Sequence, residues 1–425
     1  MSEEKIGNRG LVIIGAIIVQ LCLGTIYAWT IFQTALTGGT YNWPSLNTQL
    51  PFAAGLASFA LFMIFAGRWQ DNVGPRKVAT VGGILLGLGY ILASLIDFLA
   101  LDATMGTIYL IVTYGIVGGA GIGFAYVCPI AALVKWFPDK KGAITGIAVA
   151  GFGGGALIFL YIEEFLINTL SGGFVGMPFL YLGIIYLVGV VLGSQILVNP
   201  PEGWLPEGFT PPATTADASG EGAMPSEMIR TSSFWLLWLM FVFAATAGLM
   251  TLGNVKSAAG FVDPLVLDPL LQLGALIGGI MSIFNAIGRI VWGAVSDKHG
   301  RANTMALMFI ILAAAMFGLA WVSSSTPTEG LWITITVFAS LVGFCFGGNF
   351  ALFPSATADF WGSKNVGKNY GVMFTAYGIA GITGALVAGP IVDATGSYFM
   401  AFVVTGVLAL VAVILILVLR RMKTQ

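Results

Sequence analysis

The residue of this 425-residue chain with the clearest capacity for chemistry is Arg289, which lies inside a long apolar run. It stands eight residues before Asp297, about 12 Å along a helix. Burying an arginine at membrane depth costs about 2.5–3.5 kcal/mol on the insertion scale, and a guanidinium cannot avoid that cost by losing its proton. Because it binds a carboxylate through two parallel hydrogen bonds, Arg289 is a candidate anion-binding residue. The alternative is a side chain that snorkels to the membrane surface.

The sequence offers Arg289 no obvious counter-ion at mid-membrane depth. We expect the acids that border the apolar runs to lie near span ends, and these are Asp97, Glu163, Glu164, Asp359 and Asp393. A substrate that brings its own negative charge would fill the gap. Asn285 lies one helical turn before Arg289, on the same face. Its amide could hydrogen-bond that substrate but cannot titrate, and the alternative is a role in helix packing.

These residues must be positioned by membrane helices, because 57% of the chain is apolar and only 9% is charged, against about 25% charged residues in an ordinary soluble domain. Apolar runs of roughly 20 residues each suffice for one crossing. A polar segment, 198–230, separates two sets of six such runs. The predicted spans are 10–33, 50–68, 78–97, 106–134, 143–166, 177–197, 231–253, 269–294, 303–322, 331–354, 369–391 and 397–419.

The distribution of basic residues indicates the topology. With both termini in the cytoplasm of a cell, and the chain in its inner membrane, 16 of the 18 lysines and arginines fall in cytoplasmic segments. The extracytoplasmic loops hold only Lys256. This bias is the one that the positive-inside rule predicts, and a wrong number of spans would have destroyed it.

The two halves of the sequence repeat. The loop after the second span has Gly67, Asp71, Gly74 and Arg76, and the loop after the eighth has Gly293, Asp297, Gly300 and Arg301, at an offset of 226 residues. We expect two six-helix bundles, 1–197 and 231–425, joined by a cytoplasmic linker, 198–230. Inverted or repeated bundles of this kind place a substrate site near the membrane midplane, exposed to each side in turn by rocking.

The Gly-x-x-x-Asp-x-x-Gly-Pro-Arg-Lys loop and its partner resemble the major facilitator superfamily over essentially the whole chain. Further segments, taken in order, resemble the oxalate/formate antiporters and their relatives, the monocarboxylate transporters: Tyr27-Ala-Trp29, Gly119–Tyr126, Trp136–Gly142, Phe234–Trp238, Ala351–Ser355 and Asn369-Tyr-Gly371. The resemblance implies an all-α integral membrane protein of twelve helices. It also implies that the Asp71/Arg76 and Asp297/Arg301 pairs act as cytoplasmic latches that break when access changes, with simple positive-inside anchoring as the alternative.

The resemblance implies substrate-binding residues as well. Arg289 matches the family's essential arginine in the eighth span, and pocket aromatics of the family match Tyr126, Tyr27, Phe346, Phe350 and Phe374. Tyr377 stands where oxalate transporters of the family carry a lysine, so a single cation and a phenol would face the substrate. That pairing suits a monoanion better than a dianion. Animal monocarboxylate transporters carry an aspartate where this chain has Asn285, so their proton mechanism cannot be copied onto it.

We therefore expect a secondary transporter of small monocarboxylates such as lactate or pyruvate, driven by proton symport. The alternative is exchange of one carboxylate for another, as in oxalate:formate antiport. We expect no enzymatic activity, no cofactor and no metal site, since the apolar runs lack a histidine, a paired acid or a His/Cys cluster. A net charge of −1 argues against nucleic acid as a partner. The expected partners are a small organic anion, a proton and the lipid bilayer, and the expected state is a monomer.

Overall fold

The computed structural model describes residues 9–38, 40–201, 203–206, 208, 222–267 and 273–423, and every regular element in these ranges is helical. Much of the predicted linker, including 209–221, lies outside the described residues. The first half contains α1 (Arg9–Leu23), the 3-10 helix η1 (Gly24–Ala28), α2 (Thr30–Thr37), α3 (Ser45–Val73), α4 (Pro75–Ala93), α5 (Ile96–Leu99), α6 (Ala103–Leu110), the π-helical segment η2 (Ile111–Gly118), α7 (Gly119–Trp136), α8 (Lys141–Phe165), the π-helical segment η3 (Leu166–Leu170) and α9 (Gly176–Gln195).

The second half has the same character. It contains α11 (Pro225–Met228), α12 (Ser232–Val262), η4 (Pro264–Leu267), α13 (Leu273–His299), α14 (Arg301–Ser323), α15 (Leu331–Trp361), α16 (Val366–Met373), α17 (Thr375–Thr395) and α18 (Phe399–Lys423).

Eleven helical stretches of the described chain are long and apolar enough to cross a membrane. The remaining predicted span, 369–391, is occupied by α16 and α17, which are separated at Phe374. The prediction of an all-α membrane protein with twelve helices is therefore confirmed. Several spans run further than the apolar pattern indicated; among them, α12 continues to Val262, α15 continues to Trp361, and the fifth span continues from α8 through η3 to Leu170.

The repeated loops adopt the same backbone turn in both halves. Gly74 follows α3 with φ of 89°, and Gly300 follows α13 with φ of 82°. Glycine adopts this left-handed conformation without steric cost, so each loop can end one helix and begin the next after a single residue. Pro75 then occupies the first turn of α4, where its missing N–H costs nothing. The offset of 226 residues found in the sequence thus corresponds to a repeated local structure.

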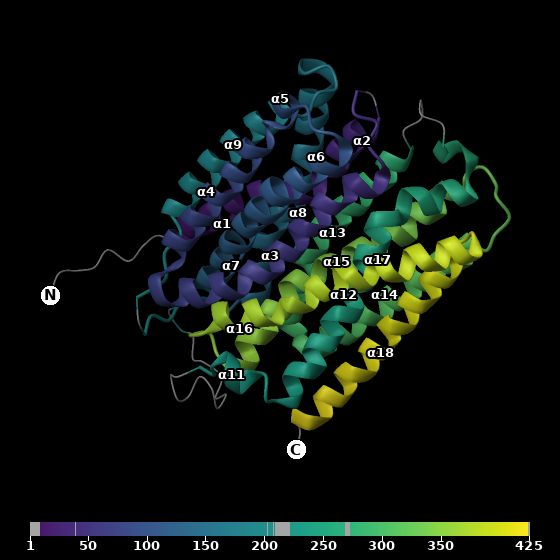
Figure 1. Cartoon of the computed structure of the whole chain (residues 1–425). Coiled ribbons are helices and arrows are strands. Elements are labelled where there is room, and N and C mark those ends of the chain that lie inside the picture. The colour runs from purple at the N-terminus through teal and green to yellow at the C-terminus, as the bar shows by residue number, and fades with distance from the viewer. Residues whose placement is uncertain are drawn as a thin grey trace. The chain divides into compact units, whose positions relative to one another are not determined.

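The chain forms two compact units, which differ from the predicted bundles by two short segments. The first unit comprises Met1–Asp139, Gly151–Pro225 and Thr357–Phe374, and the second comprises Lys140–Ala150, Ser226–Ala356 and Thr375–Gln425. Within the first, α4 packs along α9 and α7, and α3 packs along α7 and α16 (Figure 1). Within the second, α14 packs along α18, and α12 packs along α17 and α18 (Figure 1). The start of α8 and the segment that ends in α16 therefore belong to the unit built mainly from the other half of the sequence.

Candidate functional site

Arg289 is fully buried in the second compact unit, at 0% exposure, on α13. Its Nε donates a hydrogen bond to Asn285 Oδ1 at 3.0 Å, and its Nη1 donates to the main-chain oxygen of Val149 at 2.6 Å. The guanidinium carbon also lies 4.4 Å from the ring centroid of Phe350, within the range of a cation–π interaction. The side chain therefore does not snorkel to the protein surface, and its orientation is fixed by three neighbours that carry no formal charge.

Close helix packing holds Arg289 and Asn285 in place. A Cβ atom on Gly288 would collide with the main chain of Phe344, and one on Gly347 would collide with the main chain of Asn285, so α13 and α15 cross almost in backbone contact. Gly146 of α8 approaches the main chain of Arg289 in the same way. Small residues at such crossings let membrane helices pack closely. Three helices therefore fix the backbone from which Arg289 projects.

Phe350 connects Arg289 to the other residues predicted for this cluster. Its ring lies 5.2 Å from that of Phe346 and 5.5 Å from that of Tyr377, in edge-on contacts that aromatic pairs favour. The phenol of Tyr377 is 1% exposed and comes from α17. The structure thus brings together five predicted site residues, which we name the arginine cluster: Arg289, Asn285, Phe346, Phe350 and Tyr377.

The remaining predicted aromatics gather in the first compact unit. Tyr126 of α7 is 1% exposed, and its ring centroid lies 5.4 Å from Phe374 and 5.3 Å from Phe152. Tyr27 of η1 packs edge-on against the same Phe152 at 5.2 Å. Phe59 of α3 joins this group, 5.1 Å from both Tyr126 and Phe374. We name these five residues the tyrosine cluster; Phe59 and Phe152 were not predicted, because nothing in the sequence distinguishes them from other apolar aromatics.

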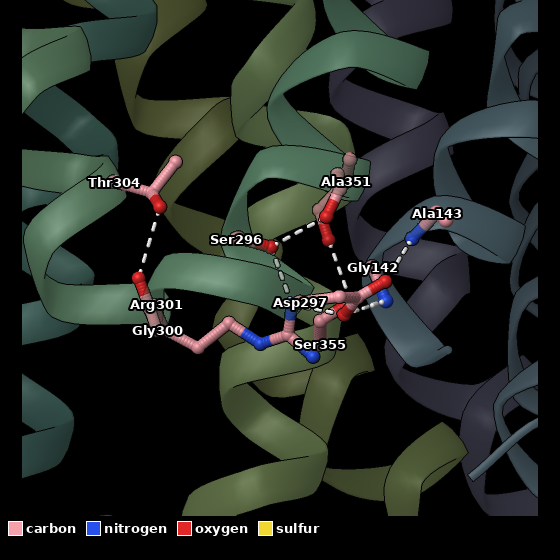
Figure 2. A network of polar contacts seen from close by, with 10 residues as sticks. Gly142, Ala143, Ser296, Asp297, Gly300, Arg301, Thr304, Ala351 and Ser355 are labelled. Atoms are coloured by element: carbon pink, nitrogen blue, oxygen red, sulfur yellow. Dashed lines mark hydrogen bonds and ion pairs between the residues drawn. The ribbon is translucent and has the colours of Figure 1, made fainter. Parts of the chain in front are cut away.

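The two repeated loops share a geometry that centres on an aspartate in each. Figure 2 shows the second loop, with Asp297. Asp297, in the last turn of α13, accepts hydrogen bonds from the main-chain N–H groups of Gly142 at 2.9 Å and Ala143 at 2.7 Å, and so caps the amino terminus of α8. Arg301 Nη1 pairs with the same carboxylate at 2.6 Å and also contacts Ser296. A carboxylate at a helix amino terminus is stabilised by the unpaired N–H groups and the helix dipole. The predicted Asp297/Arg301 pair is present.

Asp71 makes the equivalent contact in the first unit, although with a different cation. Its Oδ2 accepts a hydrogen bond from the main-chain N–H of Lys368 at 2.8 Å, at the start of α16. Its Oδ1 pairs with Lys135 Nζ at 3.2 Å. The cation that pairs with Asp71 is thus Lys135, at the end of α7, whereas Arg76 lies exposed on the first turn of α4. The latch role of Arg76 stays a prediction. Asp71 and Lys368 correspond to Asp297 and Ala143 at offsets of 226 and 225 residues.

The Major Facilitator Superfamily model matches residues 11–328 and 270–425, which together cover nearly all of the sequence. The chain belongs to the major facilitator superfamily. Its structure agrees, since it is similar to that of the proton:xylose symporter XylE, with a TM-score of 0.74, 96% of this chain and 94% of that chain covered, and 12% identity. That likeness concerns the fold alone.

The names of two curated relatives of this facilitator state which compounds those relatives transport. The oxalate:formate antiporter of Oxalobacter formigenes is 27% identical over 423 residues, covering 97% of this chain and 91% of that protein. Apicoplast pyruvate carrier 1 of Toxoplasma gondii is 27% identical over 455 residues, covering 86% of this chain and 80% of that protein. The facilitator is thus a membrane transporter related to proteins that are named for small organic carboxylates.

One acid of the facilitator is more deeply enclosed by the protein than the sequence indicated. Glu163 was expected near a span end, but it is 0% exposed, because the helix continues through η3 to Leu170 and neighbouring helices cover it. Thr25 donates a hydrogen bond to its Oε1 at 3.1 Å. Glu164, the next residue, is exposed as expected. The sequence could not reveal this burial, because it does not show which helices pack over Glu163.

Proposed function

We propose that this major facilitator is a secondary active transporter of small monocarboxylates, of the lactate or pyruvate type, coupled to protons. The observation that carries the proposal is the buried guanidinium of Arg289, held by an amide, a main-chain carbonyl and an aromatic face. The two relatives named for oxalate, formate and pyruvate support a carboxylate as its ligand.

The arginine cluster is suited to this ligand because its cation is already oriented. Arginine presents several N–H donors in a planar fork that matches the two oxygens of a carboxylate. Asn285 and Val149 hold Nε and Nη1, and the ring of Phe350 supports one face. Little rotamer entropy would remain to be lost on binding, which favours affinity. The aromatic rings would exclude water and strengthen the charge–charge attraction.

Tyr377 supports a monoanion as the preferred substrate. Its ring lies 5.5 Å from Phe350, and Phe350 in turn contacts Arg289. A phenol there would offer a hydrogen bond to a hydroxyl or keto oxygen, whereas a second carboxylate would require a second cation. We propose that Tyr126, Tyr27 and Phe374 of the tyrosine cluster contact the apolar end of the substrate.

The two aspartate caps support transport by alternating access. Asp297 caps α8 and Asp71 caps α16, so each cap joins a helix of one proposed bundle to a helix of the other. Rocking of 1–197 against 231–425 would break both caps, so they would act as latches for one access state. We propose that this end faces the cytoplasm of a cell, with both termini there and the chain in the inner membrane, as a monomer.

Counterflow in proteoliposomes tests the function directly. Vesicles loaded with unlabelled lactate should accumulate labelled lactate, and pyruvate should compete with it. A thermal-shift series with one- to four-carbon mono- and dicarboxylates should stabilise the protein more with lactate than with oxalate. Stronger stabilisation by oxalate, or no counterflow with any carboxylate, would overturn the monocarboxylate proposal.

The alternative function is carboxylate exchange, which the likeness to an oxalate:formate antiporter favours. Uptake at varied external pH distinguishes the two. Accumulation driven by an inward proton gradient into vesicles without internal carboxylate supports symport. Vigorous counterflow with no dependence on that gradient supports exchange.

A further inference from the structure

Glu163 is a buried acid that the arginine cluster does not use. It lies on α8 in the first compact unit and is 0% exposed. Oε1 accepts a hydrogen bond from Thr25 Oγ1 at 3.1 Å. Among the described residues, Oε2 is buried and has no hydrogen-bond partner. Acids inside membrane spans are rare and commonly mark proton or ion pathways.

Hydroxyl groups, not cations, surround this carboxyl. Thr25 Oγ1 lies 3.1 Å from the hydroxyl of Tyr90 on α4 and 2.6 Å from that of Tyr186 on α9. The titratable groups that face Glu163 from the packed helices are Tyr90, Tyr114 and Tyr186, with Cys22 beyond Tyr186. Within the described part of the chain, no lysine, arginine or histidine lies against it. We name Glu163, Thr25, Tyr90 and Tyr186 the acid cluster.

The environment decides the charge that Glu163 can carry. An ionised carboxylate with no cation and an unsatisfied oxygen in an apolar interior is strongly destabilised. A neutral carboxyl avoids burying the charge, since Oε1 can still accept from Thr25 while Oε2 carries a proton. Ionisation requires water to reach the group. Enclosure by the helices therefore favours the neutral, protonated carboxyl.

The acid cluster is also connected to the tyrosine cluster by two elements. Thr25 lies two residues before Tyr27 on η1, the segment where the first span departs from α-helical geometry. Phe152, which contacts Tyr27 and Tyr126, lies on α8 with Glu163. Gly24 approaches the main chain of Phe152 so closely that a Cβ would collide with it. A shift of η1 against α8 would therefore affect the carboxyl and the aromatic rings together.

We propose that Glu163 is the group that binds the co-transported proton. The inference rests on the proposed monocarboxylate transport and names the group that would couple it. The proton passes from water on one side of the membrane to Oε2, stays there while the acid cluster is closed, and leaves to water on the other side. Arg289 provides the fixed charge for the anion, and Glu163 provides the charge that changes.

The test compares Glu163→Gln with Glu164→Gln in proteoliposomes. Glutamine keeps the shape and hydrogen bonds of a protonated carboxyl but cannot release a proton. For Glu163→Gln we expect lactate accumulation driven by a proton gradient to fall by about tenfold or more, while lactate counterflow stays within about twofold of the wild type. Glu164→Gln removes an exposed charge one residue away and should leave both activities unchanged.

Three other outcomes would contradict the assignment of Glu163 as the proton site. Gradient-driven accumulation that survives in Glu163→Gln excludes Glu163 as the proton site. If Glu163→Gln loses both counterflow and accumulation, although the purified protein is monodisperse, Glu163 has a structural or substrate-binding role. Accumulation that follows a sodium gradient and depends on Glu163 makes the group a metal-cation ligand. Absence of counterflow in the wild type, by contrast, refutes monocarboxylate transport itself.

An infrared measurement covers the case in which Glu163→Gln does not fold. The wild type should show the stretching band of a buried protonated carboxyl, and that band should persist in Glu164→Gln. The band should lose intensity as pH rises in the presence of lactate, because the transport cycle hydrates the group. A wild-type spectrum without a protonated carboxyl band at neutral pH would falsify the inference.

Discussion

Glu163 of the first compact unit and Arg289 of the second are both 0% exposed, and they differ in whether the side chain can lose its charge. Arg289 in the second unit is held by an amide oxygen, a carbonyl oxygen and an aromatic ring, all of which stabilise a cation. Glu163 in the first unit is held by a threonine hydroxyl, with two tyrosine hydroxyls beside it. A guanidinium keeps its proton at any physiological pH, whereas a carboxyl does not. The difference supports the division of tasks that we propose, with Arg289 binding the anion and Glu163 binding the proton.

The largest effect is expected at Arg289. Arg289→Ala removes the fixed charge, and lactate counterflow should fall by about 100-fold or more, in line with the loss of a buried charge pair of about 2–5 kcal/mol. Counterflow with purified, monodisperse protein measures it. Arg289→Lys keeps the charge without the planar fork and should recover only part of the activity. Full activity of the alanine variant would remove the arginine cluster from the site.

The second-largest effect is expected at Tyr377, where a substitution changes the number of cations in the arginine cluster. Tyr377→Lys adds a second positive charge beside Phe350, so the preference for oxalate over lactate should rise by about tenfold, equivalent to about 1.4 kcal/mol. Competition of each acid against labelled lactate measures the ratio. Tyr377→Phe keeps the ring and should retain the monocarboxylate preference. An unchanged ratio in the lysine variant would place Tyr377 away from the substrate.

A smaller effect is expected at Asn285, which orients Nε of Arg289. Asn285→Ala should raise the KM for lactate by about five- to tenfold, equivalent to about 1–1.4 kcal/mol, because it removes a hydrogen bond that orients the guanidinium. Asn285→Asp should be more harmful at neutral pH, since its carboxylate would compete with the substrate for Arg289. Initial rates over a range of pH should show partial recovery in acid. A flat profile would contradict that competition.

The smallest effect is expected in the acid cluster at Thr25. Thr25→Val removes the hydroxyl that joins Glu163, Tyr90 and Tyr186, at a cost of about 1–3 kcal/mol of stability. The melting temperature should fall by several degrees, and the proton:lactate ratio should fall below that of the wild type, as measured with a pH-sensitive dye. Thr25→Ser keeps the hydroxyl and serves as the control. Counterflow should be unaffected in both.

The sequence was sufficient for the fold because lipid imposes a strong constraint. Apolar runs of the right length, a polar segment between 197 and 231, and basic residues on one side predicted twelve spans. The repeated Asp71 and Asp297 loops showed that the two halves are related. These features are local or periodic, so they can be found without knowing which helices touch. Span ends such as Leu170 were missed because a π-helical turn extends the helix beyond the apolar run.

The candidate site was predicted in part. Arg289 and Asn285 were found because a charge and an amide one turn apart are unusual inside a span. Val149 could not be found, since its main-chain oxygen binds Arg289 and any residue type supplies one. Lys135 was missed in favour of Arg76, because sequence proximity does not reveal which way a side chain leaves its helix. Glu163 was set aside because it lies near the end of a predicted span, and the sequence does not show that neighbouring helices bury it.

The aspartate caps of the repeated loops have a consequence for ancestry. Each half of the chain provides one cap, Asp71 or Asp297, and one capped helix, α16 or α8, with the capped N–H groups at matching positions. Two identical copies of a single half could satisfy both contacts at once by two-fold pairing, as in an isologous dimer. Fusion of a duplicated gene would then have inherited a working interface, and the different cations, Lys135 and Arg301, would be later divergence.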